Sequence, residues 1–449
     1  MEMSAQEPQG GAHDRGPDHV RRADGQARES WPDAVALRDA LAGVSGGQVD
    51  DLGDAAVQTR IAQLAWSCTV EPGDATAGLL IGALGPVEAL EAVGSGALLR
   101  RARARGSGAG IPFDELATAV ERWRHRLDLE RTVAILRSSA RLGVHAVLPG
   151  DREWPTQLGD LGPHAPCALW VRGSLDTLRQ LTPSVALVGA RASTSYGEEV
   201  TVRLASGLAN RGFGLVSGGA YGIDAVAHRV ALAEGAPTVA VLAGGPDRLY
   251  PQGNRSLLER IIAHGALVSE LPIGQAPTRW RFLQRNRIIS ALASATVVVE
   301  AGRRSGAANT AAHALTLGRP LGAVPGPVTS AASVGCHRLL RESDASLITS
   351  VDDIVELLGD HRGSELELPD GAAWPGERGR ERADGDRPSS NAVRARDALR
   401  VGRPQRSAEI ASAAGLTVAE TAAGLAELEL NGLAQEGAAG WTRTTRAKR

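Results

Sequence analysis

The segment from Ser184 to Asp224 has the sequence SVALVGARASTSYGEEVTVRLASGLANRGFGLVSGGAYGID. Its apolar run Val185–Val188 ends at a glycine and is typical of a strand buried on both faces of a parallel sheet. Glu198–Asn210 has helical spacing, Phe213–Val216 is a second apolar run, and Asp224 is a good N-cap residue for a further helix. This alternation predicts an α/β fold with a doubly wound parallel sheet.

The same alternation continues on both sides of this segment. Downstream, four apolar runs predict strands, and helical patterns separate or follow them. The expected strands are Thr238–Leu242, Ala266–Ser269, Ala295–Glu300 and Leu321–Val324, and the expected helices are Arg255–Ala263, Leu283–Leu292, Ala307–Leu317 and Val351–Leu358. Upstream, Ala146–Leu148 and Ala168–Val171 predict two more strands of the same sheet.

The chain has 449 residues, which suits several domains. Residues 1–30 are charged and aperiodic, so we expect a disordered tail. We expect a helical domain over 31–143, which includes a long helix at Phe113–Leu142, then the α/β domain over 144–362 and a linker over 363–390. Residues 391–449 predict a winged-helix-like module of three helices and a hairpin. Its third helix carries three Glu and no Arg, which favours protein contact over duplex DNA.

The overall composition excludes several classes of protein. The formal net charge is −2, so nucleic-acid binding would need a local basic patch. Three widely spaced cysteines argue against a disulfide framework or a zinc site and fit a reduced, cytoplasmic compartment. The polar start MEMSAQEPQGGAHDRG does not predict a signal peptide, and no apolar stretch predicts a membrane span.

Two glycine-containing loops follow the first two strands of the opening segment. Residues 189–197 and 218–222 should lie at one edge of the sheet, where glycine lets backbone amides approach an anion and a helix N-terminus adds positive charge. Arg191 could supply a permanent cation there. The alternative is that Gly218 and Gly219 only make a tight turn, because a short glycine motif is weak.

Aromatic and basic residues gather in the same set of loops. All three tyrosines, Tyr196, Tyr221 and Tyr250, follow predicted strands, and Arg279 to Arg304 contains six Arg and one acid, Glu300. Cations interleaved with exposed rings suit single-stranded nucleic acid, because phosphates pair with Arg and bases stack on rings. The alternatives are that the tyrosines anchor loops and that the Arg run is a solvated helix face.

No recognisable set of catalytic residues accompanies these loops. Asp224 is most simply a helix cap, and His228 one turn later is typical of a packed histidine. Glu300, at a strand end, is the best lone carboxylate, and with Arg191 it could serve a nucleotide phosphoribohydrolase of the Rossmann type. The absence of a Walker A lysine excludes P-loop ATP hydrolysis. A pure scaffold, with structural glycine loops, stays open as a third interpretation.

Seven motifs in order resemble the DNA-processing protein A family (DprA, also called Smf). They are VGARASTSYG (Val188–Gly197), SGGAYGIDAVAH (Ser217–His228), AVLAGGPDRLYPQGNR (Ala240–Arg255), SELPIG (Ser269–Gly274), QRNRIISALA (Gln284–Ala293), VVVEAGRRSGAANTA (Val297–Ala311) and AVPGPV (Ala323–Val328). The resemblance implies an extended Rossmann domain that binds single-stranded DNA without catalysis, cofactor or metal. It also implies a homodimer that protects incoming DNA and loads the RecA recombinase during natural transformation. The flanks are similar too: a helical domain of the SAM or helix-hairpin-helix kind and a C-terminal winged helix.

The resemblance and the loop pattern together give the expected nucleic-acid-binding residues. These are Gly189, Arg191, Ser193, Ser217, Gly218, Gly219, Tyr221, Asn254, Arg255, Arg285, Asn286, Arg287, Ser305 and Gly306. Tyr221 departs from the family pattern, where a basic residue is common, and exchanges a phosphate contact for a stacking one. The SGAANTA loop is less polar than is common in the family.

Overall fold

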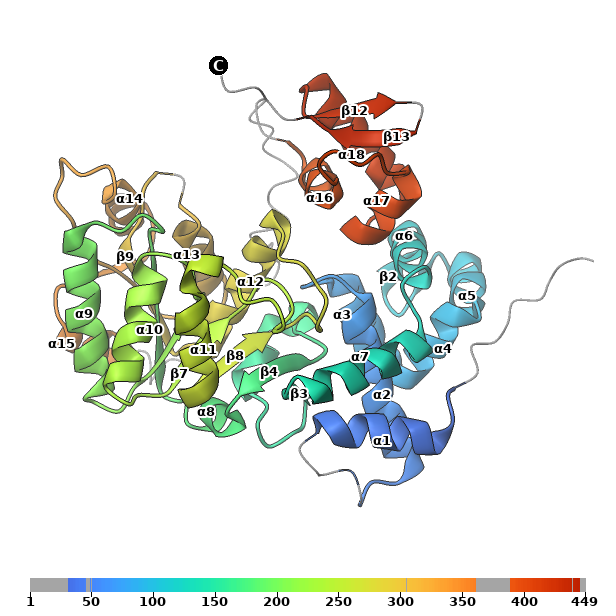
Figure 1. The fold of residues 1–449 in the computed structure, drawn as a ribbon, viewed down its shortest axis with the longest axis horizontal. Coiled ribbons are helices and arrows are strands. Elements are labelled where there is room, and N and C mark those ends of the chain that lie inside the picture. The colour runs from blue at the N-terminus through green and yellow to red at the C-terminus, as the bar shows by residue number, and fades with distance from the viewer. Residues whose placement is uncertain are drawn as a thin grey trace, which may run out of the picture.

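The computed structural model describes residues 31–45, 49, 51–303, 305–360, 388–437 and 439–444. Figure 1 shows the sheet and its helices beside the N-terminal helices, with a small C-terminal module above them. The expected disordered tail over 1–30 lies outside the described residues, and so does nearly all of the expected linker over 363–390.

Within the described residues, one nine-stranded sheet forms the centre of the fold. Its strand order is β11-β10-β9-β5-β6-β7-β8-β4-β3. The seven strands from β11 to β8 run parallel to their neighbours, whereas β4 pairs antiparallel with β8, and β3 pairs antiparallel with β4. The strands are β3 Val144–Val147, β4 Leu169–Gly173, β5 Ser184–Gly189, β6 Gly214–Ser217, β7 Thr238–Val241, β8 Ala266–Ser269, β9 Ala295–Glu300, β10 Leu321–Ala323 and β11 Ser346–Leu347.

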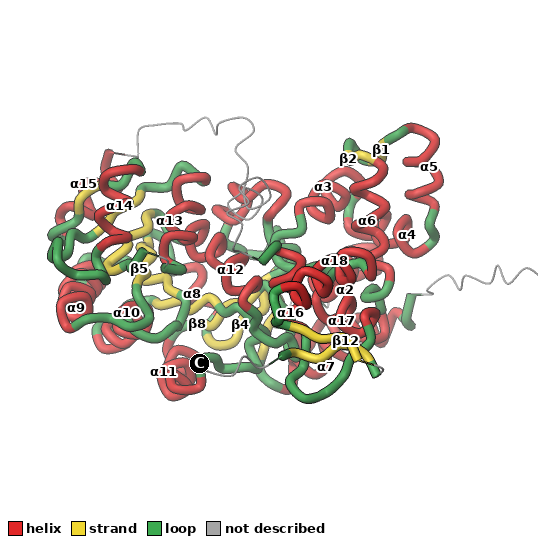
Figure 2. Tube along the Cα trace, turned by 90° about the horizontal axis from the view of Figure 1, so that it is seen from above, coloured by secondary structure: helices red, strands yellow, loops and turns green. Residues whose placement is uncertain are grey.

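Helices cover both faces of this sheet (Figure 2). Alternate residues of β5 point to opposite faces, as the pleat requires. Leu187 belongs to a core with α9 and α10, whereas Val188 belongs to a core with α12 and α13. The elements that accompany the sheet are η1 Thr156–His164, α8 Leu175–Arg179, α9 Ser195–Ala209, α10 Ile223–Ala233, η2 Gln252–Asn254, α11 Arg255–His264, α12 Arg279–Leu292, α13 Ala307–Thr316, α14 Val334–Glu342 and α15 Val351–Asp360.

The chain reverses its direction of travel across the sheet beside β5. From β5 it proceeds through β6 and β7 to β8, and then returns to place β9 on the other side of β5. The loops after β5 and β9 therefore diverge to opposite faces of the sheet. Such a switch point leaves a crevice outside the carboxyl ends of the two strands, which is where open α/β sheets bind ligands. The predicted α/β class with a Rossmann-like sheet is confirmed.

Two sequence expectations about helix starts are wrong. The helix predicted over Leu283–Leu292 begins earlier, because Thr278 accepts a hydrogen bond from the amide of Arg281 and Arg279–Phe282 forms the first turn of α12. Asp224 was expected to cap a helix, but α10 begins one residue earlier, and the Asp224 carboxylate accepts the amide N–H of Gly218 at 3.1 Å.

The N-terminal part is helical, as expected, but its long helix is divided. Asp128 caps a new helix by accepting from the amide of Arg131, so Phe113–Leu142 splits into two helices. The elements are α1 Ala34–Val44, α2 Asp54–Thr69, α3 Ala75–Leu84, α4 Pro86–Gly94, α5 Ala97–Arg105, β1 Ser107–Gly108, β2 Ile111–Pro112, α6 Phe113–Arg124 and α7 Leu129–Arg141. Helices α1, α2 and α7 share a core with β3 and β4, so the domain boundary near 143 stays a prediction.

The C-terminal module comprises the described residues from 388 to 444. It consists of α16 Ser390–Ala398, α17 Ser407–Ala414, α18 Val418–Leu430 and the antiparallel hairpin of β12 Ala434–Gly437 and β13 Gly440–Arg443. Its own small core includes Ile410, Leu425 and Trp441. Helix α16 packs against α12, so the module lies next to the carboxyl edge of the sheet.

No single helix among the described residues is long and apolar enough to cross a membrane. The neighbouring helices α3 and α4 meet the length and composition test only when joined, and they are bent by 111°.

Candidate functional site

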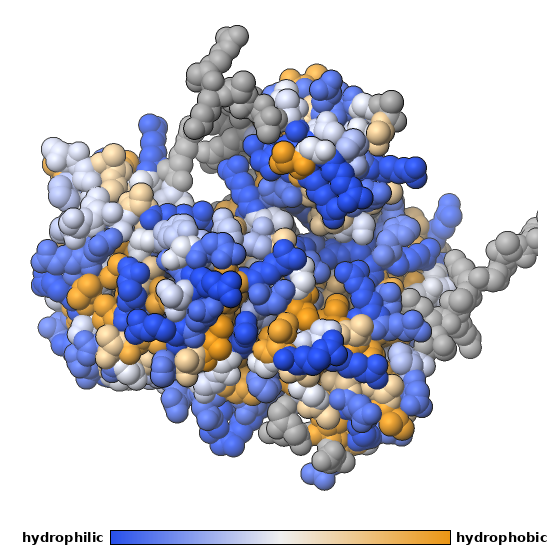
Figure 3. All heavy atoms as spheres, viewed as in Figure 1, coloured by the Kyte–Doolittle hydropathy of each residue, from blue (hydrophilic) through white to orange (hydrophobic). Residues whose placement is uncertain are grey.

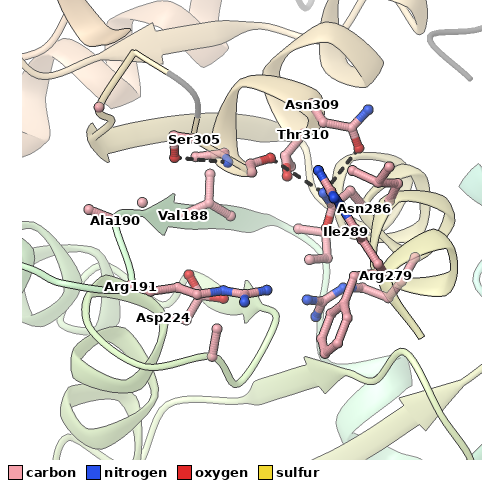
Figure 4. A pocket seen from close by; sticks show the side chains of 18 of the residues that line it. Val188, Ala190, Arg191, Asp224, Arg279, Asn286, Ile289, Ser305, Asn309 and Thr310 are labelled. Atoms are coloured by element: carbon pink, nitrogen blue, oxygen red, sulfur yellow. Dashed lines mark hydrogen bonds between the residues drawn. The ribbon is translucent and has the colours of Figure 1, made fainter. Parts of the chain in front are cut away.

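A pocket of about 1060 Å³ lies at the switch point of the sheet. The loop after β5 forms one wall, the start of α12 forms a second, and the segment that leads into α13 forms a third (Figure 4). The pairing of β5 with β9 shifts register between Val188 and Gly189, just where the wall begins. Gly189 also packs closely on α10, since a Cβ there would lie 2.6 Å from Ile223. The topology therefore opens a cavity beside Gly189, where the backbone lies too close to α10 for any residue with a Cβ atom.

Two exposed arginines carry positive charge into this pocket. Arg191 extends from the β5 loop toward α12 (Figure 4), and Arg279 lies at the first position of α12. Among the described residues, no carboxylate lies within 4 Å of either guanidinium group. Both charges are therefore open to an anionic ligand.

An aromatic platform stands beside these cations. The guanidinium carbon of Arg191 lies 5.1 Å from the centroid of the Phe282 ring. The Tyr250 ring lies 5.7 Å from the Phe282 ring, with the two planes at 53°. Since Tyr250 is 47% exposed, its ring remains open for contact with a ligand. The pocket thus offers cations and ring surfaces side by side.

Two buried side chains of opposite charge, Arg285 and Asp224, line the pocket. Arg285 donates hydrogen bonds to the carbonyl oxygens of Gly218 and Val241. Burial, opposed by Asp224 and assisted by Arg191, lowers the pKa of Arg285 to about 10. Burial raises the pKa of Asp224, and Arg285 opposes that rise. A Cβ at Gly218 would lie 2.2 Å from the Arg285 guanidinium group, so this loop depends on glycine for close approach.

Asparagine and serine side chains fix the opposite wall. The Asn286 amide donates to the Asn309 side-chain oxygen at 3.0 Å and to the Gly306 carbonyl at 3.4 Å, which ties α12 to the start of α13. The Ser305 hydroxyl oxygen accepts from the Ala307 amide at 3.2 Å. The first turn of α13 is therefore held at the edge of the pocket, where its dipole favours an anion.

The pocket gathers six of the fourteen residues expected from the sequence. They are Gly189, Arg191, Arg285, Asn286, Ser305 and Gly306. The other eight lie outside its lining: Ser193, Ser217, Gly218, Gly219, Tyr221, Asn254, Arg255 and Arg287. Sequence reasoning missed Arg279 and Phe282 as individual site residues, although the arginine-rich segment that contains them was recognised.

Arg287 requires the clearest correction. Its side chain is 1% exposed, and its Nη2 atom contacts both carboxylate oxygens of Glu270 at 2.5 Å. Although it is close in sequence to Arg285 on α12, it points away from the pocket. The structure thus places Arg287 outside this pocket, with its guanidinium group held by Glu270.

Several of the remaining expected residues hold the loops in place. The Asn254 amide donates to the carbonyls of Gly219 and Ala220 at 3.1 and 3.0 Å, and the Ser217 hydroxyl donates to the Leu187 carbonyl at 2.7 Å. Arg255 pairs with Glu259 at 2.9 Å, and the Ser193 hydroxyl donates to Glu198 at 2.7 Å. These contacts shape the loops that surround the pocket.

The three tyrosines do not act as one set. The Tyr196 hydroxyl donates to the Pro325 carbonyl at 2.5 Å, and the Tyr221 hydroxyl oxygen accepts from the Gly253 amide at 3.1 Å. Both therefore anchor loops, as the alternative interpretation held, although the Tyr221 ring is 45% exposed outside the pocket. Of the three, only Tyr250 lines the pocket.

The two candidate acid–base residues are structural. Glu300 is 2% exposed, and its carboxylate accepts hydrogen bonds from the amide and the hydroxyl of Thr194, the N-cap residue of α9. His228 is fully buried, with its Nδ1 atom 2.8 Å from the Thr238 hydroxyl, and burial lowers its pKa to about 3. The geometry leaves neither group facing the pocket.

Comparison with known proteins identifies the family. The family model described as DNA recombination-mediator protein A matches residues 145–359. The putative DNA processing protein DprA of Mycobacterium tuberculosis is 43% identical over 380 residues, which cover 82% of this chain and 90% of the relative. The solved structure of DprA from Streptococcus pneumoniae has 28% identity and a TM-score of 0.49, and covers 67% of this chain and 97% of its own.

A second solved structure concerns the single-stranded DNA binding mode of DNA processing protein A from Helicobacter pylori. It has 28% identity and a TM-score of 0.44, and covers 48% of this chain and 96% of its own. The relative with 43% identity is matched over nine-tenths of its length, and the family model covers the sheet and its helices. The chain therefore belongs to the DNA recombination-mediator protein A family, the family of the DprA and Smf proteins.

Proposed function

We propose that this protein is a DNA recombination mediator that holds single-stranded DNA in the pocket at the switch point. Family membership supports the general role. The observation that carries the binding mode is Arg191, an exposed cation without an acidic partner among the described residues, which stacks on Phe282 inside that pocket. Phosphates would meet Arg191 and Arg279, and bases would stack on the Phe282–Tyr250 platform.

The same geometry favours single strands over duplex. In a duplex the bases are stacked on one another and paired, so their faces cannot reach an aromatic platform set between two arginines. An unpaired strand can present a base face to the platform and a phosphate to Arg191 at the same time. The residues we assign to DNA are Arg191, Arg279, Phe282, Tyr250 and Asn286.

The proposal contains no catalytic step. A phosphoribohydrolase would need a carboxylate that reaches the ribose, whereas Glu300 is buried and bonded to Thr194. The lining of the pocket includes the carboxylates of Asp224 and Asp397, and each of them already accepts a backbone N–H group. We therefore assign Glu300 to holding the loop after β5.

The family also suggests a more specific role in the cell. We propose that the protein works in the cytoplasm as a homodimer, protects incoming single strands, and loads the RecA recombinase on them during natural transformation. We also propose that the C-terminal module is a winged helix that serves protein contact, because α18 carries three Glu and no Arg.

A binding titration tests the central proposal. Fluorescence anisotropy with a labelled oligo-dT and with duplex of equal length, at two salt concentrations, should show tighter binding of the single strand. The logarithm of affinity should fall with the logarithm of salt by about 0.7 for each phosphate neutralised. Arg191→Ala should weaken binding, whereas Arg229→Ala, an exposed arginine on α10 outside the pocket, should not. Equal binding of duplex, or equal affinity of both variants, would overturn the proposal.

A further inference from the structure

A carboxylate from the C-terminal module lies on the rim of the pocket. The Oδ2 atom of Asp397, on α16, accepts the backbone N–H groups of Arg279 at 2.7 Å and Trp280 at 3.4 Å. These amides belong to the first turn of α12, where N–H groups have no partner within the helix. Asp397 also lines the pocket itself. An acidic side chain thus occupies the anion-binding end of a helix that borders the proposed DNA site.

The surface that brings Asp397 there is polar. Arg394 of α16 lies 5.6 Å from the centroid of the Trp280 ring, and Arg122 of α6 pairs with Glu420 of α18 at 3.4 Å. Gly415 of the module packs on Glu71, since a Cβ there would lie 2.5 Å from that side chain. Figure 3 shows hydrophilic residues along the line where the module meets the rest of the chain. Polar interfaces of this kind within one chain permit relative motion.

We propose that the C-terminal module is a reversible cap on the DNA site, with Asp397 in the position that a DNA phosphate takes when the strand binds. The proposal rests on the proposed function. A helix N-terminus attracts any anion, and a carboxylate and a phosphate cannot occupy the same two amides. The strand must therefore displace Asp397 to reach the start of α12, and part of the binding free energy is used to release the module.

The competition is local and does not depend on the overall charge of the module. Arg443 of β13 lines the same pocket, so the docked module brings one positive and one negative side chain to it. Release of the module gives the strand access to the two α12 amides and to the space that α16 occupies. The affinity of the full-length chain is lowered by the fraction of molecules in which the module is docked.

Two variants of the full-length chain test the cap. Asp397→Ala removes the carboxylate from the α12 amides and should raise the affinity for oligo-dT by roughly 3- to 10-fold. Arg122→Ala breaks the ion pair with Glu420, which joins the module to the N-terminal helices outside the DNA pocket. Loss of this positive charge by itself favours weaker DNA binding. Because the substitution also undocks the module, we nevertheless expect it to raise the affinity for oligo-dT, as Asp397→Ala does.

A matched control and a second readout separate the outcomes. Glu409→Ala removes an exposed acid of the same module that lies outside the pocket, and it should leave the affinity unchanged. Hydrogen exchange of peptides from α16 should increase when oligo-dT is added to the wild-type chain. If wild type binds and Asp397→Ala and Arg122→Ala match it, the cap is wrong but the DNA site stands. If both variants bind oligo-dT more weakly than wild type, the docked module forms part of the DNA site, and the proposal of a cap is wrong. If neither wild type nor variants bind, the proposed function fails as well.

Discussion

Two arginines that look equivalent in the sequence have opposite environments. Arg191 lies in the pocket without an acidic partner among the described residues, whereas Arg287 is buried against Glu270. An exposed guanidinium group can bind phosphate at little cost, because it is not already committed to a carboxylate. A buried pair is structural, because removing one partner leaves the other charge unpaired in a region of low polarity. Substitution of Arg191 should therefore lower DNA affinity, whereas substitution of Arg287 should lower the stability of the fold.

Two substitutions of Arg191 should distinguish the contribution of its charge to DNA binding from that of its planar guanidinium group. Arg191→Lys keeps a positive charge but loses the planar group over Phe282, so affinity for oligo-dT should fall only partly and the salt dependence should be kept. Arg191→Ala should lose about tenfold in affinity and about 0.7 in salt slope, with the thermal midpoint nearly unchanged. Anisotropy at several salt concentrations and a melting curve measure both. A lysine variant that binds as tightly as wild type would contradict the stacking role, and one with the reduced salt slope of the alanine variant would contradict the phosphate contact.

Arg287→Ala should act on stability and not on binding. Removal of the guanidinium group leaves the Glu270 carboxylate, 13% exposed, without its partner, which should cost about 3–5 kcal/mol. The double variant Arg287→Ala with Glu270→Ala should lose less than the sum of the two single variants, since no charge stays unpaired. Urea unfolding of the three variants gives these differences. A well-folded Arg287→Ala protein that loses DNA affinity would instead restore Arg287 to the site.

At the scale of elements, the sheet was predictable and the start of α12 was not. Strands β8 and β9 have the predicted bounds, because short apolar runs buried on both faces leave little choice. The first turn of α12 follows Pro277 and depends on the Thr278 cap, in a segment with no apolar periodicity. Without that turn, the sequence could not place Arg279 and Phe282 beside Arg191. The predicted helix Leu283–Leu292 already put Arg285 and Arg287 on different sides, but it could not show which side faces the pocket. Helix α14 was also missed, and the break between α6 and α7 depends on the Asp128 cap, which the continuous helical pattern of Phe113–Leu142 concealed.

The first turn of α12 should carry the stacking part of DNA binding. Phe282→Ala removes the ring that lies between Arg191 and Tyr250, and should cost about 1–3 kcal/mol of binding free energy for a stacked base. The salt slope should stay the same, because no cation is lost. Tyr221→Ala is the control, since its exposed ring lies outside the pocket. If Tyr221→Ala is the more damaging of the two, the platform is misplaced.

At the scale of the whole molecule, one buried carboxylate joins parts from three regions of the chain. Glu71, between α2 and α3, accepts from Arg281 of α12 at 2.8 and 3.0 Å and from Arg126 at 2.8 Å. Arg394 of the C-terminal module lies near enough to influence it. The side chain of Glu71 is 10% exposed. Glu71 thus ties the N-terminal helices to the pocket helix, and the C-terminal module packs beside it through Gly415.

This contact should make the assembly sensitive to acid. Burial alone would raise the pKa of Glu71, but Arg281 and then Arg126 outweigh it and hold the pKa at about 2, below the ordinary 4.5. Between these values the unfolded chain binds the proton and the folded chain does not. The stabilisation is therefore complete above about pH 5 and is lost as the pH falls toward 2. A shift of this size corresponds to a free energy on the order of 3 kcal/mol.

Glu71→Gln should therefore be less stable than wild type at pH 7 and should lose less stability between pH 5 and pH 3. Other groups, including His228, add to the acid sensitivity of both proteins, so the difference between the two unfolding curves isolates Glu71. Glu88→Gln, at an exposed position of α4, supplies a control in which the curves should coincide with wild type. Urea midpoints at pH 7, 5, 4 and 3 measure the effect, and an unchanged gap between wild type and Glu71→Gln across that range would show that the carboxylate is not the group that acid titrates.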